Sequence, residues 1–202
     1  MLSPPSLFCS QPSISDTDWE NPKLVSIFVA REPISRALAG DGIMSRNYPN
    51  IFVHKNGTEA QWWDFVRDNK NDNYALRILS DVTCCDGNST DTKYLEMAKE
   101  LVSRFTFVLD IACLVDGLDK LAEILGFPVS NSLKTPDKGH VHPPVDERFP
   151  FPQTYEYLKE RLKLDIELYE WAKSIALVDC DVVQKEEEKA AAAAAGQSNN
   201  SS

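Results

Sequence analysis

The sequence lacks long apolar runs and any excess of positive charge, and each absence excludes a class of protein. A membrane-spanning helix needs about eighteen consecutive apolar residues, and no such run occurs. Residues 1–15 are rich in Pro and Ser and lack the apolar core of a signal peptide. The chain carries 21 Lys and Arg against 31 Asp and Glu, a net charge of −10, whereas nucleic acids are bound by basic surfaces. We therefore expect neither a membrane segment in this chain nor a nucleic-acid partner.

Cysteine and histidine are too scattered to predict a metal site. The five cysteines show no metal-ligand spacing: Cys9, Cys84, Cys85, Cys113 and Cys180. His140 and His142 have no third ligand near them in the sequence. A disulfide between the adjacent Cys84 and Cys85 would strain the backbone. Either one of them pairs with a distant cysteine, as an oxidising compartment would allow, or the thiols are free and buried.

Length and composition predict a single globular domain with polar ends. The chain has 202 residues, 43% of them hydrophobic and 26% charged, which is enough for one substantial core. We expect a disordered arm over residues 1–20, a domain over residues 21–178 and a low-complexity tail over residues 179–202. Helical spacing over residues 59–66, 95–105, 114–125 and 155–177, with a β-like run at residues 107–111, predicts an α/β fold whose C-terminal half is largely helical.

The segment from Leu24 to Gly40 is the most informative part of the sequence. Its apolar residues predict a buried strand from Leu24 to Ala30, and Pro33 is typical of the first turn of a helix. Arg31 would then lie at the carboxyl end of a strand, where α/β sheets bind ligands. An arginine there suits a phosphate, because its planar guanidinium can donate two hydrogen bonds at once. The alternative is an arginine that only pairs with a nearby carboxylate.

The same segment carries a resemblance to a known family. The run from Arg31 to Arg36 (Arg-Glu-Pro-Ile-Ser-Arg) resembles the arginine–acid–proline–x–x–arginine signature of Golgi-type carbohydrate sulfotransferases. Three blocks then follow in the order of that family: residues 72–79, which contain Arg77, the helix–strand–helix of residues 92–127, and the helix of residues 165–172. The resemblance implies the donor 3′-phosphoadenosine 5′-phosphosulfate (PAPS), with Arg31 on its 3′-phosphate and Arg36 and Arg77 in the donor site.

By the same resemblance, the fold is an incomplete, P-loop-like, three-layer sulfotransferase fold. The implied activity is transfer of a sulfuryl group from PAPS to a hydroxyl of a glycan or glycoconjugate in the Golgi lumen. The sequons at Asn56 and Asn88 lie in polar stretches, as glycosylation there would require.

The sequence departs from the family pattern at several positions. Ala39 stands where the family has a second phosphate-binding serine, and Ala112 where many members have an acidic residue. No lysine-containing phosphate loop precedes Arg31, so the chain corresponds to the C-terminal two thirds of such a domain. No residue can be assigned as the general base. The alternative function is therefore a non-catalytic pseudoenzyme or interaction scaffold that keeps the fold.

Overall fold

The computed structural model describes residues 19–40, 42–80, 92–128, 146–186 and 189. Several expectations lie outside these ranges: nearly all of the predicted N-terminal arm, the adjacent cysteines, the histidine pair and most of the predicted tail. The sequon at Asn88 lies outside them too, whereas Asn56 is described and exposed.

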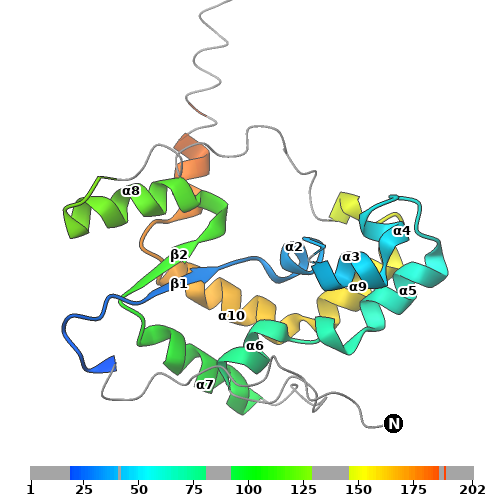
Figure 1. Cartoon of the computed structure of the whole chain (residues 1–202), viewed down its shortest axis with the longest axis horizontal. Coiled ribbons are helices and arrows are strands. Elements are labelled where there is room, and N and C mark those ends of the chain that lie inside the picture. Colours follow the sequence, from blue (N-terminus) through cyan, green and yellow to red (C-terminus); the bar gives the residue numbers. More distant parts are fainter. Residues whose placement is uncertain (1–18, 41, 81–91, 129–145, 187–188, 190–202) are drawn as a thin grey trace, which may run out of the picture.

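Most of the described residues are helical, and two short strands form one parallel sheet (Figure 1). The strands are β1 (Ile27–Ala30) and β2 (Phe107–Asp110). The helices are α2 (Pro33–Ala37), α3 (Gly42–Asn47), α4 (Pro49–Phe52), α5 (Glu59–Arg67), α6 (Tyr74–Leu79), α7 (Thr92–Ser103), α8 (Leu114–Leu125), α9 (Pro152–Arg161) and α10 (Lys163–Ser174). The prediction of a mixed α/β protein with a helical C-terminal half is confirmed at this level. Among the described residues, every helix is too short or too polar to span a lipid bilayer.

The register of the sheet places the two strand ends at one edge. Ala30, the last residue of β1, is paired with Asp110, the last residue of β2. The buried side of the sheet packs on α7 and α10 through a cluster that contains Ala30, Val108, Val102 and Ala172. Because the strands are parallel, the segments that leave this edge start side by side.

The opposite side of the sheet is covered unevenly. α8 packs against β2, where a Cβ added to Gly117 would lie 3.2 Å from Leu109 Cδ2. On the same side of β1, Ile27 and Val29 are 41% and 46% exposed. The prediction of a buried strand over residues 24–30 is therefore wrong in both extent and burial. In the described part of the chain, no helix lies over this half of the sheet, and β1 is an edge strand.

A second core holds α2, α3, α4, α5 and α9 together. At its centre Phe65 is fully buried and meets the rings of Tyr48, Phe52 and Trp62 edge to face, with centroids 5.5, 5.2 and 5.9 Å away. α5 begins at a capping box in which Thr58 and Gln61 exchange hydrogen bonds. The prediction of a helix near residues 59–66 is confirmed, and its aromatic residues pack in this core.

The long helix predicted over residues 155–177 is two helices, α9 and α10, that meet at Leu162. In a continuous helix the N–H of Asp165 would donate to the carbonyl of Arg161. It donates instead to Asn73 Oδ1, at 3.0 Å. A side chain inserted into the helical hydrogen-bond ladder is a recognised cause of a kink, and here it comes from a residue remote in sequence.

Candidate anion site at the carboxyl edge of the sheet

Arg31 follows β1 directly and is exposed. It makes no hydrogen bond or ion pair to any residue that the structure describes. Its neighbour Glu32 is engaged elsewhere, because its carboxylate accepts the N–H groups of Ile34 (2.9 Å) and Ser35 and so caps the start of α2. The expected alternative, an arginine neutralised by a nearby carboxylate, is not found among the described residues.

Arg36 lies in the last turn of α2 and is held on two sides. Its guanidinium stacks on the ring of Tyr74, with Cζ 4.3 Å from the ring centroid, and its Nη2 lies 4.0 Å from Asp165 Oδ2. Its Nε and Nη2 atoms are buried, and neither has a hydrogen-bond acceptor within the described chain. Burial lowers the pKa of Arg36, with a smaller contribution in the same direction from Arg31 and Arg77, while Asp165 raises it. The guanidinium stays charged, so buried donors remain without acceptors.

Arg77 was predicted to lie in the donor site. In the structure it is a buried residue of α6. It is only 4% exposed, and its Nη2 donates to the carbonyl of Lys70 at 3.4 Å. It is near enough to Arg36 to lower the pKa of that group. Arg77 therefore adds positive potential to the site but offers little surface to a ligand.

Arg148 is a fourth arginine of this group, and sequence reasoning missed it. Its Nη2 donates to the carbonyl of Leu38, near the end of α2, at 3.1 Å. Burial lowers the pKa of Arg148, and Arg31 lowers it further, while Glu32 raises it. Arg148 lies in a proline-rich stretch with no periodicity that could have indicated its position.

Asp165 is a buried carboxylate that contacts both Arg36 and the start of α6. It is 1% exposed and accepts the N–H groups of Ala75 (3.0 Å) and Leu76 (2.8 Å) at the start of α6. Burial raises the pKa of Asp165, and these two hydrogen bonds together with Arg36 and Arg77 oppose that shift. Its signal in the sequence was an acidic residue on the apolar side of an amphipathic helix.

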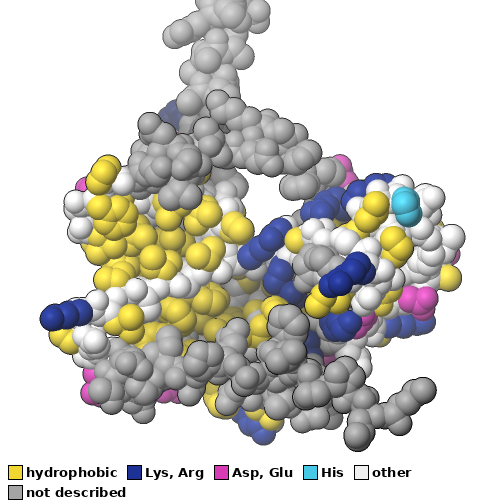
Figure 2. Space-filling model, viewed as in Figure 1, with side chains coloured by type: hydrophobic (Ala, Val, Ile, Leu, Met, Phe, Trp, Pro, Cys, Tyr) yellow, Lys and Arg dark blue, Asp and Glu magenta, His cyan; other side chains and the backbone are white. Residues whose placement is uncertain are grey.

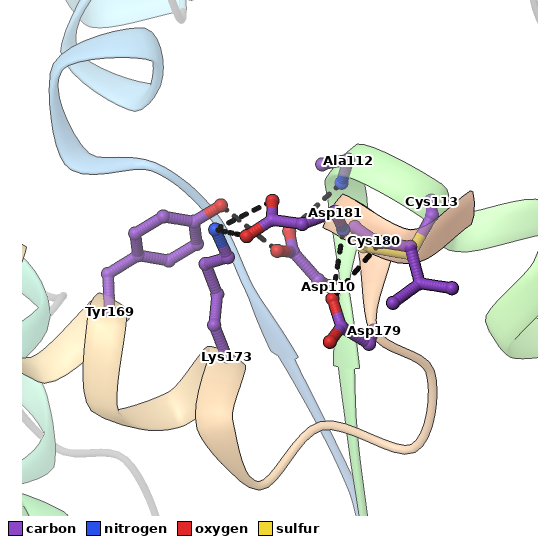
Figure 3. The surroundings of a disulfide bond; sticks show 9 residues. Asp110, Ala112, Cys113, Tyr169, Lys173, Asp179, Cys180 and Asp181 are labelled. Carbon is purple, nitrogen blue, oxygen red and sulfur yellow. Dashed lines mark hydrogen bonds and ion pairs between the residues drawn. A yellow bond between two sulfur atoms is a disulfide. The ribbon is translucent and has the colours of Figure 1, made fainter. Parts of the chain in front are cut away.

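Asp110 is the acidic residue at the end of β2, also missed from sequence (Figure 3). Its carboxylate accepts the N–H of Ala112 and the hydroxyl of Tyr169, each at 3.0 Å. Burial and the negative charge of Asp110 raise the pKa of Tyr169. Both oxygens of the Asp110 carboxylate are therefore engaged.

A disulfide joins Cys113, just after β2, to Cys180, after α10 (Figure 3). Their Cα atoms are 5.4 Å apart, and both residues are buried. The ion pair between Lys173 Nζ and Asp181 Oδ1, at 3.2 Å, joins α10 to the residue that follows Cys180. The pairing proposed for Cys84 or Cys85 lies outside the described residues.

The site as a whole is a local concentration of positive charge on an acidic protein. Lys and Arg side chains gather near α2 and α3, beside the apolar surface of β1 and α8 (Figure 2). Two of the arginines, Arg31 and Arg148, form no ion pair within the described ranges, although Glu32 lies near enough to Arg148 to raise its pKa. Such an arrangement can bind an anion by charge-assisted hydrogen bonds.

Comparisons with protein-family models, with curated proteins and with solved structures find no match to this chain. The family resemblance therefore rests on the sequence motifs alone.

Proposed function

We propose that this chain binds PAPS and serves the transfer of its sulfuryl group to a carbohydrate hydroxyl, with Arg31 on the 3′-phosphate of the donor. The observation that carries the proposal is that Arg31 is exposed at the carboxyl end of a parallel strand, with no partner among the described residues. That edge is where ligands bind in α/β sheets. A phosphate would supply the hydrogen-bond acceptors that the Arg31 guanidinium does not find among the described residues.

The neighbouring arginines fit a polyanionic ligand. The buried Nε and Nη2 of Arg36 have no acceptor in the described chain, and buried donors without acceptors are costly. Arg148 and Arg77 raise the local positive potential. Together they favour a ligand with several negative charges over a single carboxylate.

In sulfuryl transfer the acceptor hydroxyl oxygen attacks sulfur as the bond from sulfur to the bridging phosphate oxygen breaks. By analogy with phosphoryl transfer, positioning and cationic stabilisation supply most of the catalysis. Arg31 and Arg36 would position the donor through its 3′-phosphate. The acceptor proton needs a base. Asp110 does not serve, because its two oxygens already accept from Ala112 and Tyr169, and we assign that role to no described residue.

Two further features support a P-loop-like fold and a location in the Golgi lumen. The uncovered half of the sheet beside β1 fits a P-loop-like sheet of which this chain holds only part. The disulfide of Cys113 and Cys180 favours an oxidising compartment such as the Golgi lumen.

The second candidate is a non-catalytic scaffold that retains the fold. It is favoured by the same uncovered apolar strand, since exposed strand edges are common docking sites, and by Ala39 and Ala112 in place of the polar residues of the family.

Calorimetric titration with 3′-phosphoadenosine 5′-phosphate tests the proposal. We expect binding to the wild-type chain and binding about tenfold to a hundredfold weaker for Arg31→Ala, because a hydrogen bond to a charged group contributes about 1.5–3 kcal/mol. Arg104→Ala is the matched control, because Arg104 precedes β2 and so lies toward the opposite edge of the sheet. Nucleotide binding that is unaffected by Arg31→Ala would refute the assigned site. A folded chain that binds no nucleotide would favour the scaffold.

A further inference from the structure

A cleft of about 300 Å³ lies beside α4, against the second core. Its walls come from five parts of the chain: the end of α2, α4, the loop before α5, α5 itself, and residues 148 and 150. This volume is at the lower end of the range for small-molecule pockets.

The inner wall of the cleft is apolar. It is formed by Leu38, Ile51, Phe52 and Trp62, of which Leu38, Ile51 and Trp62 are buried members of the second core. The indole N–H of Trp62 makes no hydrogen bond to any described residue. Gly57 completes the wall, and a Cβ there would lie 2.8 Å from Ile51 Cγ1 and 3.2 Å from Trp62 Nε1. The glycine therefore lets the loop approach closely.

Two cations line the same cleft, Lys55 and Arg148. Lys55 has a φ of 57°, a left-handed conformation that is uncommon for residues other than glycine. Neither cation forms an ion pair within the part of the chain that the structure describes, although acidic residues outnumber basic ones in the sequence by 31 to 21. One Arg148 donor serves the Leu38 carbonyl, and its other donors remain for a ligand.

We propose that this cleft binds an aromatic anion, a small molecule whose planar ring packs on the wall formed by Trp62 and Phe52 and whose acidic group contacts Lys55 and Arg148. Aromatic walls bind planar rings through offset or edge contacts. A carboxylate, sulfonate or phosphate group would satisfy both cations by charge-assisted hydrogen bonds. Arg148 also belongs to the anion site near Arg31, whereas Lys55 and Trp62 take no part in the contacts of Arg31. Variants of Lys55 and Trp62 therefore test this cleft separately from the nucleotide proposed at Arg31.

The test uses the indole ¹⁵N–¹H resonance of Trp62, which is assigned by its loss in Trp62→Phe. Three compounds separate the two halves of the ligand: naphthalene-1-sulfonate, the neutral naphthalene-1-methanol, and inorganic sulfate. We expect the sulfonate to shift the Trp62 resonance saturably and the resonance of Trp171, in α10, to stay in place. The neutral ring should bind at least about tenfold more weakly, because it forfeits the charge-assisted contacts, and sulfate alone should leave the resonance unmoved.

Variants identify the cations. Lys55→Gln should weaken the sulfonate by about tenfold and leave the neutral compound unchanged, because only the charge is removed. Lys55 is exposed, so this change spares the core. Lys120→Gln, an exposed lysine on α8, is the matched control and should have no effect. Naphthalene-1-sulfonate that leaves the Trp62 resonance unmoved at millimolar concentration, or that binds Lys55→Gln as tightly as the wild type, would overturn the proposal.

Discussion

The backbone N–H of Asp165 donates to the side-chain carbonyl of Asn73, and these two residues, 92 positions apart, join α10 to α6. The carboxylate of Asp165 in turn accepts hydrogen bonds from the N–H groups of Ala75 and Leu76, in the first turn of α6. Asn73 takes a left-handed conformation, with a φ of 36°, to present its side chain. The exchange sets the position of Tyr74, on which Arg36 stacks. The anion site therefore depends on a buried contact that touches no ligand.

Replacing Asp165 should destabilise the fold strongly. Asp165→Ala would leave two buried N–H groups without acceptors and Arg36 without its carboxylate, and we expect a loss of about 3–5 kcal/mol in the free energy of unfolding. Asp165→Asn keeps one acceptor oxygen and should lose roughly half as much. Urea unfolding measures both. Glu156→Ala on the exposed side of α9 is the control and should stay within about 0.5 kcal/mol of wild type. A cost for Asp165→Ala as small as that of the control would contradict the structural role.

Tyr48 should make the stability depend on pH in the alkaline range. Burial raises its pKa from 10.0 to about 12, with a further contribution from the hydrogen bond that its hydroxyl donates to Asp68 at 2.9 Å. The folded-state pKa lies above the unfolded one. The contribution of the Tyr48 hydroxyl to the free energy of unfolding is therefore complete below pH 10 and is lost as the pH rises toward 12. Tyr48→Phe should cost about 1 kcal/mol at pH 7. The difference between the two proteins in urea unfolding should shrink above pH 10, and a difference that stays constant to pH 11 would contradict the shift.

The local parts of the structure were predictable because they depend on neighbours in sequence. Apolar spacing located α5, α7 and α8, and Gly126, with a φ of 73°, ends α8 as a left-handed cap. Pro33 at the start of α2 placed Arg31 between a strand and a helix. The environment of Arg36, stacked on a tyrosine of another helix, could not be obtained in this way.

The parts that were missed depend on contacts between distant segments. Whether an apolar strand is buried depends on what covers it, and the spacing of β1 holds no information that α8 lies over β2 alone. The kink at Leu162 is caused by the side chain of Asn73, so the periodicity of residues 155–177 could not show it. Arg148 joins the site because its guanidinium meets the carbonyl of Leu38, 110 residues away.

The disulfide between Cys113 and Cys180 should stabilise the protein substantially. It closes a loop with a sequence separation of 67 residues, for which the chain-entropy relation gives about 4 kcal/mol. We expect reductant to lower the midpoint of urea unfolding for the wild type. The double variant Cys113→Ala/Cys180→Ala should unfold at the lower midpoint with or without reductant. Peptide mapping under non-reducing conditions should recover the linked pair, and a wild-type midpoint that ignores reductant would contradict the bond.

The exposed side of β1 should promote self-association. Ile27 and Val29 form an uncharged, uncovered strand at the edge of the described sheet, and such edges pair readily with other chains unless charge or proline protects them. We expect the wild type to self-associate with rising concentration in sedimentation velocity and the double variant Ile27→Thr/Val29→Thr to do so less. The variant should lose at most about 1 kcal/mol of stability, since both side chains are close to half exposed. Met97→Thr replaces an equally exposed apolar residue on α7, away from the strand edge, and should sediment as the wild type does. A wild type that stays monomeric throughout would contradict the prediction. If Met97→Thr reduces association as much as the strand variant, general surface hydrophobicity rather than the open edge drives the association.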